Sequence, residues 1–74
     1  MTNPLISTNG TEFWYSRQLE YHRGNGLPAM VFLDGSEKYY QHGLLHRENG
    51  PAVVFSKSYH IEDEYWLHGD EVDK

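Results

Sequence analysis

The chain has 74 residues, of which 38% are hydrophobic and 23% charged, which is too apolar for a disordered tail. No run approaches the roughly 20 apolar residues of a membrane-spanning helix, and the absence of cysteine excludes disulfides, a thiolate nucleophile and cysteine-bound zinc. The net charge of −5 comes entirely from the residues after position 61, and a net-acidic chain does not collect phosphates, which argues against direct nucleic-acid binding.

Short apolar or aromatic runs, separated by turn residues, follow one another along the chain. They are rich in the valine, phenylalanine, tyrosine and tryptophan that a half-buried pleated surface favours, and none has the spacing of a helix. Apolar runs stand at 5–6, 29–33 and 52–55, and aromatic runs end the segments 9–15, 34–40 and 64–66. Because turns this short make neighbouring strands antiparallel, the sequence predicts an all-β fold, an antiparallel β-meander of about seven to nine short strands with little or no helix.

Dipeptides that end in glycine predict where the chain turns. Asn9-Gly10 and Asp34-Gly35 have the sequence of a type I′ hairpin turn, which needs positive φ at both central residues. His42-Gly43 and His68-Gly69 follow the aromatic strands, and there the glycine is expected to supply the second positive φ.

The same segment occurs three times. Prolines at similar spacing, Pro4, Pro28 and Pro51, each precede an apolar run. The sequence His-Arg-Gly-Asn-Gly at 22–26 matches His-Arg-Glu-Asn-Gly at 46–50. This periodicity predicts a single domain, 1–74, built from three units of roughly 24 residues. The units cover about 4–27, 28–50 and 51–74.

Alternation along the strands places aromatic rings on both faces of the sheet. Neighbouring residues such as Trp14 and Tyr15, or Tyr39 and Tyr40, point to opposite faces. The chain has no predicted helix to cover them, and a large exposed apolar patch marks an interface. We therefore expect a protein partner or a homo-oligomer. The candidate binding residues include arginines as well as aromatics, because Arg, Tyr and Trp are enriched at interface hot spots. The candidate partner-binding residues are Trp14, Tyr15, Arg23, Tyr39, Tyr40, Arg47, Tyr65 and Trp66.

Histidine and arginine also recur at equivalent positions. His22 corresponds to His46, and His42 to His68, which favours a structural role such as closing a turn or stacking on a ring. A metal site formed by His42, His46 and His68 is a weaker alternative, because three or four ligands must converge. The arginines that follow His22 and His46 are expected to bond backbone carbonyls, or to lie against aromatic faces.

The repeated segments carry a family resemblance. His22-Arg23-Gly24-Asn25-Gly26-Leu27-Pro28-Ala29 and the matching 46–52 resemble the His-Arg-x-Asn/Asp-Gly-Pro-Ala repeats of small bacterial and phage proteins. With the Asp-Gly turn and the aromatic pair they are more loosely similar to MORN-type β-hairpin repeats. The resemblance implies binding and scaffolding, and a phage source would imply inhibition of a host enzyme. The chain departs from the pattern at Leu27, which is inserted before Pro28, and in the third unit, which suits a capping unit.

Three hypotheses on function follow, with no cofactor expected. The first is a non-enzymatic interaction module, cytoplasmic because no secretory signal is evident, or in the host cytoplasm if phage-encoded. The second is an acidic inhibitor that occupies the basic, nucleic-acid-binding groove of an enzyme. Its carboxylates would be Glu62, Asp63, Glu64, Asp70, Glu71 and Asp73. The third and remotest, a histidine-based metal enzyme, lacks a nucleophile motif.

Overall fold

The computed structural model describes residues 4–16, 18, 20–24, 26–58 and 60–72, and this part of the chain is all-β. The predicted antiparallel β-meander is confirmed, and no helix that could span a membrane occurs in these ranges. The strands are β1 (Leu5–Ile6), β2 (Glu12–Phe13), β3 (Met30–Val31), β4 (Glu37–Lys38), β5 (Tyr40–Gln41), β6 (Leu44–Leu45), β7 (Val53–Val54), β8 (Tyr65–Leu67) and β9 (Asp70–Val72).

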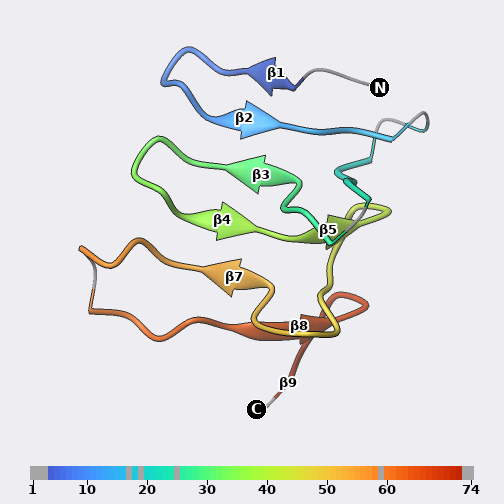
Figure 1. The fold of residues 1–74 in the computed structure, drawn as a ribbon. Helices are drawn as coiled ribbons and strands as arrows, with labels where there is room; N and C mark the ends of the chain where they lie inside the picture. The colour runs from blue at the N-terminus through green and yellow to red at the C-terminus, as the bar shows by residue number, and fades with distance from the viewer. Residues whose placement is uncertain (1–3, 17, 19, 25, 59, 73–74) are drawn as a thin grey trace.

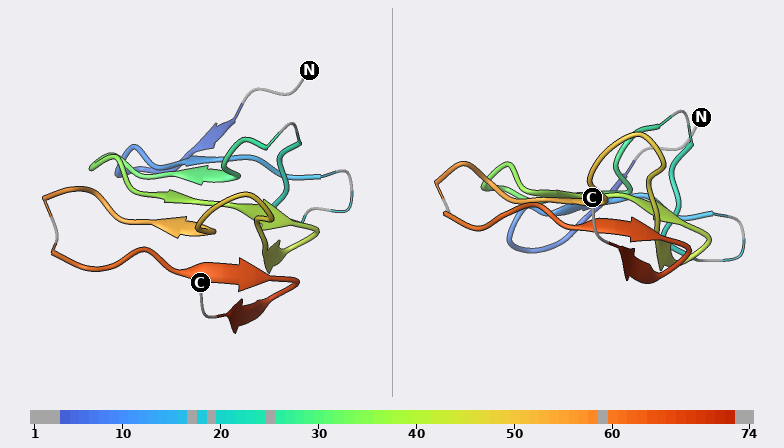
Figure 2. Two further views of the ribbon diagram at one scale, coloured as in Figure 1. Left: turned by 60° about the horizontal axis from the view of Figure 1, so that its bottom comes forward. Right: turned by 90° about the horizontal axis from the view of Figure 1, so that it is seen from below.

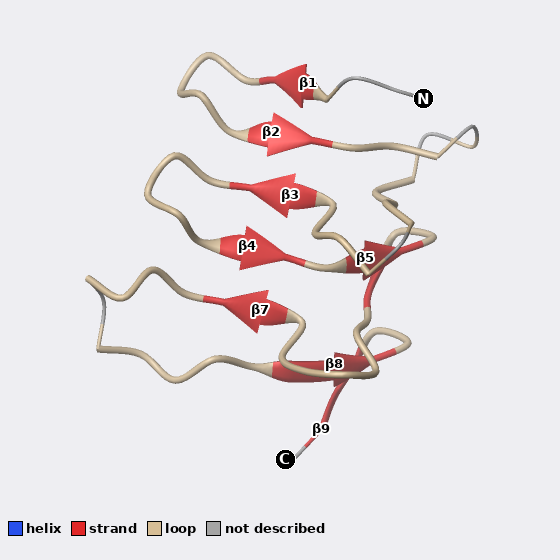
Figure 3. Cartoon of the chain, viewed as in Figure 1, coloured by secondary structure: helices blue, strands red, loops and turns tan. Residues whose placement is uncertain are grey.

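The strands form one main sheet and two separate hairpins (Figures 1 and 3). The main sheet has the order β1-β2-β3-β4-β7, with every pair antiparallel. The β5-β6 hairpin interrupts the meander between β4 and β7, and the β8-β9 hairpin follows it. Val53 also bridges to Glu64, so that the chain leading into β8 lies beside β7.

Loops and hairpins leave the sheet on opposite sides (Figure 2, right). The segments leading into β3 and β7, which contain the repeated His-Arg sequence, arch over one face. The β5-β6 and β8-β9 hairpins bend away on the other side. We call the first side the loop face and the second the hairpin face. At one end of the sheet, the arching loops therefore cover the loop face and the two hairpins lie on the hairpin face.

The register fixes which side chains share a face. Phe13 pairs with Met30, Met30 with Lys38 and Lys38 with Val53. Residues directly opposite one another point to the same side of a sheet, and their chain neighbours point to the other. The neighbours Trp14, Ala29 and Tyr39, as well as Ala52, thus belong to the opposite face from Phe13.

The prediction of type I′ turns at Asn9-Gly10 and Asp34-Gly35 is wrong. Gly35 N–H donates to the Phe32 carbonyl at 3.0 Å, and of this turn only Gly35 has positive φ, at 94°. This geometry is a type I turn followed by a left-handed glycine in a bulge. The aspartate is needed for another reason: its Oδ1 accepts from Ser36 N–H at 2.8 Å. The first turn is built the same way, with φ of 90° at Gly10.

The turns at His42-Gly43 and His68-Gly69 do have positive φ at both residues. The angles are 51° and 82° in the first and 51° and 83° in the second. A left-handed histidine is uncommon and costs conformational energy, which other contacts must offset.

The core is small and straddles the sheet. The buried apolar residues are Ala29, Met30, Tyr39, Ala52 and Val53. The two alanines are fully buried, and each is held by backbone bonds on both sides: Ala29 N–H donates to the Lys38 carbonyl at 3.0 Å, and its carbonyl accepts from Trp14 N–H at 2.8 Å.

Candidate functional site

Arg23 covers the ring of Trp14 on the loop face. Its guanidinium carbon lies 3.7 Å from the ring centroid. Its Nη1 donates to the Pro28 carbonyl at 3.2 Å, so that the side chain ties the start of the arching loop to its end. Both sequence expectations for this arginine, ring stacking and bonding to a backbone carbonyl, are met at once.

Arg47 makes the same two contacts farther along the chain. Its guanidinium carbon lies 3.9 Å from the centroid of Tyr39, and its Nη1 donates to the Pro51 carbonyl at 3.2 Å. A Cβ at Gly50 would lie 3.3 Å from the guanidinium carbon, so the arginine is sandwiched between the phenol ring and glycine backbone. The loop face therefore carries two aromatic rings that the chain itself covers.

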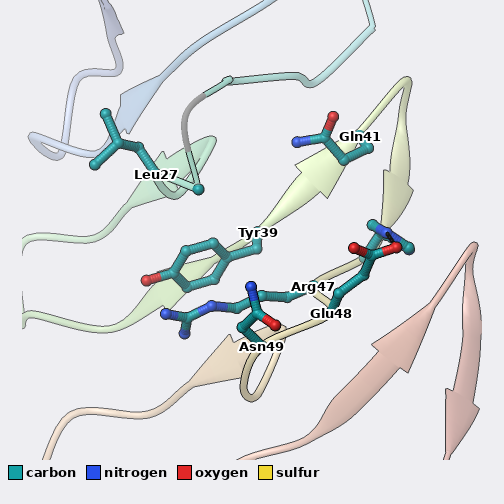
Figure 4. A pocket seen from close by; sticks show the side chains of 8 residues that line it. Leu27, Tyr39, Gln41, Arg47, Glu48 and Asn49 are labelled. Atoms are coloured by element: carbon teal, nitrogen blue, oxygen red, sulfur yellow. Dashed lines mark ion pairs between the residues drawn. The ribbon is translucent and has the colours of Figure 1, made fainter.

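An open cleft of about 400 Å³ lies between the two arching loops. Figure 4 shows the Arg47 guanidinium against the Tyr39 ring, with Leu27 and Asn49 on opposite sides of that ring in this view. Leu27, the residue inserted before Pro28, is 43% exposed and adds an apolar wall. Most of the other lining residues are polar. They include Arg47, which holds the second loop through its bond to the Pro51 carbonyl.

A row of four aromatic rings lies on the opposite side of the sheet from Trp14. Phe13 and Tyr15 have centroids 6.4 Å apart, Tyr15 stacks on Tyr21 at 5.0 Å, and Tyr21 contacts Tyr40 at 5.1 Å. Phe13 also stacks on Tyr21 at 6.0 Å. All four residues are only partly buried. We call Phe13, Tyr15, Tyr21 and Tyr40 the aromatic row.

Local strand geometry explains the row. Phe13 and Tyr15 are two residues apart on an extended segment and so point to the same side. Tyr21 forms an antiparallel bridge with Tyr15, which places the two rings directly opposite each other. Tyr40 comes from β5, and Gly43 N–H, in the turn that follows, donates to the Tyr21 carbonyl at 2.9 Å, which docks that hairpin beside the row.

The environment raises the pKa of phenols on both faces. Burial raises the pKa of Tyr40, and the nearby Tyr21 raises it further. A side-chain hydrogen bond with Tyr21 is the main cause of the raised pKa of Tyr15. Burial, followed by the charge of Glu37, raises the pKa of Tyr39, although Arg47 lowers it. With a pKa raised above that of an ordinary phenol, Tyr15, Tyr39 and Tyr40 remain neutral throughout the physiological range.

The structure divides the eight residues that the sequence singled out for partner binding. Trp14, Arg23, Tyr39 and Arg47 form the two internal stacks on the loop face. Tyr15 and Tyr40 come together through Tyr21 on the opposite side.

Tyr65 and Trp66 belong to β8, outside the main sheet. The Trp66 indole Nε1–H donates to Glu64 Oε1 at 3.0 Å. Phe13 and Tyr21, which complete the aromatic row, are not among the eight. The alternation of Phe13 with Tyr15 was a usable signal for Phe13, whereas Tyr21 is positioned by its bridge to Tyr15, for which the sequence has no local signal.

The acidic residues do not form one free patch. Asp63 Oδ1 accepts from Phe55 N–H at 3.0 Å, and Glu64 holds the Trp66 indole. Glu62 is exposed in the connection between β7 and β8, whereas Asp70 and Glu71 are exposed on β9. Figure 1 shows that connection and the β8-β9 turn at opposite ends of the sheet. Asp73 lies outside the described residues.

Histidines pair rather than converge on a point. His22 and His42 have ring centroids 4.5 Å apart, and His46 and His68 have theirs 4.3 Å apart. Their predicted role in closing turns is confirmed, because each pair also carries a hydrogen bond to a turn N–H. Within the described ranges, no group of three or more histidine or acidic side chains is arranged to hold a metal ion.

Comparisons with family models, with curated proteins and with solved structures found no significant match to this chain.

Proposed function

We propose that the chain is a non-enzymatic interaction module that binds another protein through the aromatic row. The observation that supports this is the contrast between the two faces. On the loop face, an arginine of the same chain is stacked on Trp14, which stays half-buried, and another on Tyr39, which is buried. On the other face, four rings contact one another while each remains partly open to solvent.

The chemistry of the row suits protein recognition. Tyrosine offers a large apolar surface with a hydroxyl at its end, and it is enriched at the energetic centres of interfaces. Mutual stacking fixes the rings before a partner arrives, so that little side-chain entropy is lost on binding. The expected partner surface is apolar and offers carbonyl groups to the neutral phenols.

A second copy of the chain is the alternative partner. Strand β1 lies at the edge of the sheet, and its Leu5 and Ile6 side chains are 61% and 65% exposed. Exposed edge strands can pair with another chain. Light scattering on the purified protein identifies this alternative, because self-association raises the measured mass with concentration.

The test is an affinity capture from the native host with matched baits. Tyr15→Thr and Tyr21→Thr remove ring surface from the row while keeping residues that favour strands. Leu33→Thr is the control, since Leu33 is 80% exposed and lies outside the row. Circular dichroism and urea unfolding must first show that each bait is folded. We expect a protein held by wild type and Leu33→Thr and lost from both tyrosine variants.

Two further results bear on the proposal. Asp70→Asn with Glu71→Gln removes exposed charge from β9, and loss of capture with this bait alone, together with steep salt dependence, would favour the acidic inhibitor instead. If neither capture nor the mass in solution responds to the tyrosine substitutions, the aromatic row is not a binding surface.

A further inference from the structure

Two histidines accept hydrogen bonds from the turns that follow them in the fold. His22 Nδ1 accepts from the backbone N–H of His42 at 3.1 Å. His46 Nδ1 accepts in the same way from His68 N–H at 3.0 Å. In both cases the donor lies in a left-handed turn residue, with φ of 51°. The imidazole contact therefore helps to hold a backbone conformation that is unfavourable by itself.

Each turn is docked by a second bond next to the first. Gly43 N–H donates to the Tyr21 carbonyl and Gly69 N–H to the Leu45 carbonyl, both at 2.9 Å. Two adjacent N–H groups of the turn thus bond to two adjacent residues of the preceding segment. We call the His22–His42 and His46–His68 contacts the two histidine locks.

The acceptor role fixes the protonation state of the accepting ring. An imidazole nitrogen can accept only when it carries no proton, so His22 and His46 must be neutral, with the proton on Nε2. A second proton would place an N–H against the turn N–H and remove the bond. It would also place a positive charge beside the partner ring, about 4.5 Å away or less.

Two carboxylates and two guanidinium groups lie near the locks. In the described part of the chain, Glu20 Oε1 lies 3.8 Å from His42 Nδ1, and Glu48 Oε2 lies 3.9 Å from His46 Nε2. Both distances are too long for a hydrogen bond, and the carboxylates are 45% and 75% exposed, so water screens their interaction with the imidazoles. Arg23 and Arg47 follow the accepting histidines in sequence, but their guanidinium groups are stacked on Trp14 and Tyr39.

The first lock adjoins the aromatic row. Tyr21 directly precedes His22, and Tyr40 lies two residues before His42. The contact between their rings, at 5.1 Å, spans the two segments that the lock joins. The lock is one of three hydrogen bonds between these segments, beside those that Gly43 N–H and Gln41 Nε2 donate to the Tyr21 and Arg23 carbonyls. Opening it loosens the β5-β6 hairpin, and with it Tyr40, from the other three rings of the row.

We propose that the two histidine locks are sensitive to protons and that the first, His22–His42, passes this sensitivity to the aromatic row: a neutral imidazole helps to hold Tyr40 against the other rings, and mild acid opens the lock and releases the bound protein. Imidazoles change charge between about pH 5 and pH 8, so that the change falls within the physiological range. The release of a partner rests on the proposed function, whereas the opening of the locks does not.

The test uses asparagine, whose Oδ1 can accept the turn N–H without titrating in this range. Urea unfolding is measured at pH 7.5 and pH 5.0 for wild type, for the double variant His22→Asn/His46→Asn, and for His60→Asn. His60 is exposed and is a matched control outside the locks. Wild type and His60→Asn should lose stability from pH 7.5 to pH 5.0, because opening a lock removes a hydrogen bond to a turn N–H. The double variant should lose much less.

A second measurement needs no variant. Long-range ¹H–¹⁵N spectra of the imidazoles at pH 7.5 should show two histidines with the proton on Nε2, and nuclear Overhauser contacts between Tyr21 and Tyr40 should weaken at pH 5.0. Equal acid sensitivity of wild type and the double variant would overturn the locks, as would protonated Nδ1 in both accepting rings at pH 7.5.

Partner release is tested separately from the locks. Protein captured by wild type should elute at pH 5.0 and stay bound to the double variant. If both baits release it alike while unfolding differs, the locks stand but do not control binding. If the baits capture nothing that depends on the row, the proposed function fails, and the unfolding and spectra still decide the locks.

Discussion

Replacing Arg47 by lysine tests how much a single stacked guanidinium contributes to this small protein. The guanidinium carbon lies 3.9 Å from the Tyr39 centroid, and Nη1 bonds to the Pro51 carbonyl at 3.2 Å. Lysine keeps the charge and can make one hydrogen bond, but it cannot lie flat on the ring or present the planar fork. The loss is therefore the stack and part of the bond.

The expected cost follows from those two contacts. A partly exposed cation–π contact contributes about 0.5–1 kcal/mol, and a hydrogen bond from a charged donor about 1.5–3 kcal/mol, of which lysine retains a part. Arg47→Lys should therefore lower the free energy of unfolding by about 1–2 kcal/mol. In a domain of this size that lowers Tm by about 4–16 °C.

Urea unfolding and calorimetry measure this directly. Arg23→Lys should cost a similar amount, because its distances to Trp14 and to the Pro28 carbonyl are nearly the same. Lys57→Arg is the control on an exposed cation and should change stability by less than about 0.5 kcal/mol. If Arg47→Lys is no more destabilising than that control, the stack does not hold the loop and the reasoning fails.

Two further predictions concern the turns and the phenols. Gly43→Ala should lower the free energy of unfolding by about 1–2 kcal/mol, because φ is 82° at Gly43. The control Gly24→Ala, at a position without positive φ and with open space around it, should change it by less than about 0.5 kcal/mol. Equal urea midpoints for the two variants would contradict the turn assignment. The raised pKa of Tyr40 means that the unfolded chain loses its phenolic proton first, so stability is complete below about pH 10 and falls above it. Urea midpoints between pH 8 and pH 11 should fall less for Tyr40→Phe than for wild type, and parallel curves would refute this.

The turn residues show why sequence reasoning succeeded at some positions and failed at others. Positive φ at Gly35 was predicted correctly, since only glycine adopts it without cost. The turn type was wrong because Asp34-Gly35 also fits a type I turn followed by a bulge. The two turn types differ in which residues form the last hydrogen bonds of the hairpin. Here these bonds run from Phe32 N–H to the Ser36 carbonyl and from Gly35 N–H to the Phe32 carbonyl.

The sequence predicts which rings share a face of the sheet, but not which rings are covered by other parts of the chain. Alternation correctly separated Tyr15 from Trp14, because consecutive strand residues point to opposite faces. Whether a ring is covered depends on a loop that returns from elsewhere in the chain. The sequence placed Arg23 near the rings, but only the structure shows that its guanidinium lies over the Trp14 ring, which stays half-buried.

Local patterns thus determined the all-β class, the antiparallel neighbours and the positions of the glycine turns, because strand alternation and left-handed backbone depend on residues close in sequence. Tertiary structure alone decided the division into a five-stranded sheet with two hairpins, the self-covered loop face and the pairing of His22 with His42. Those features arise from contacts between segments some twenty residues apart, where several pairings satisfy the same local preferences and packing selects one.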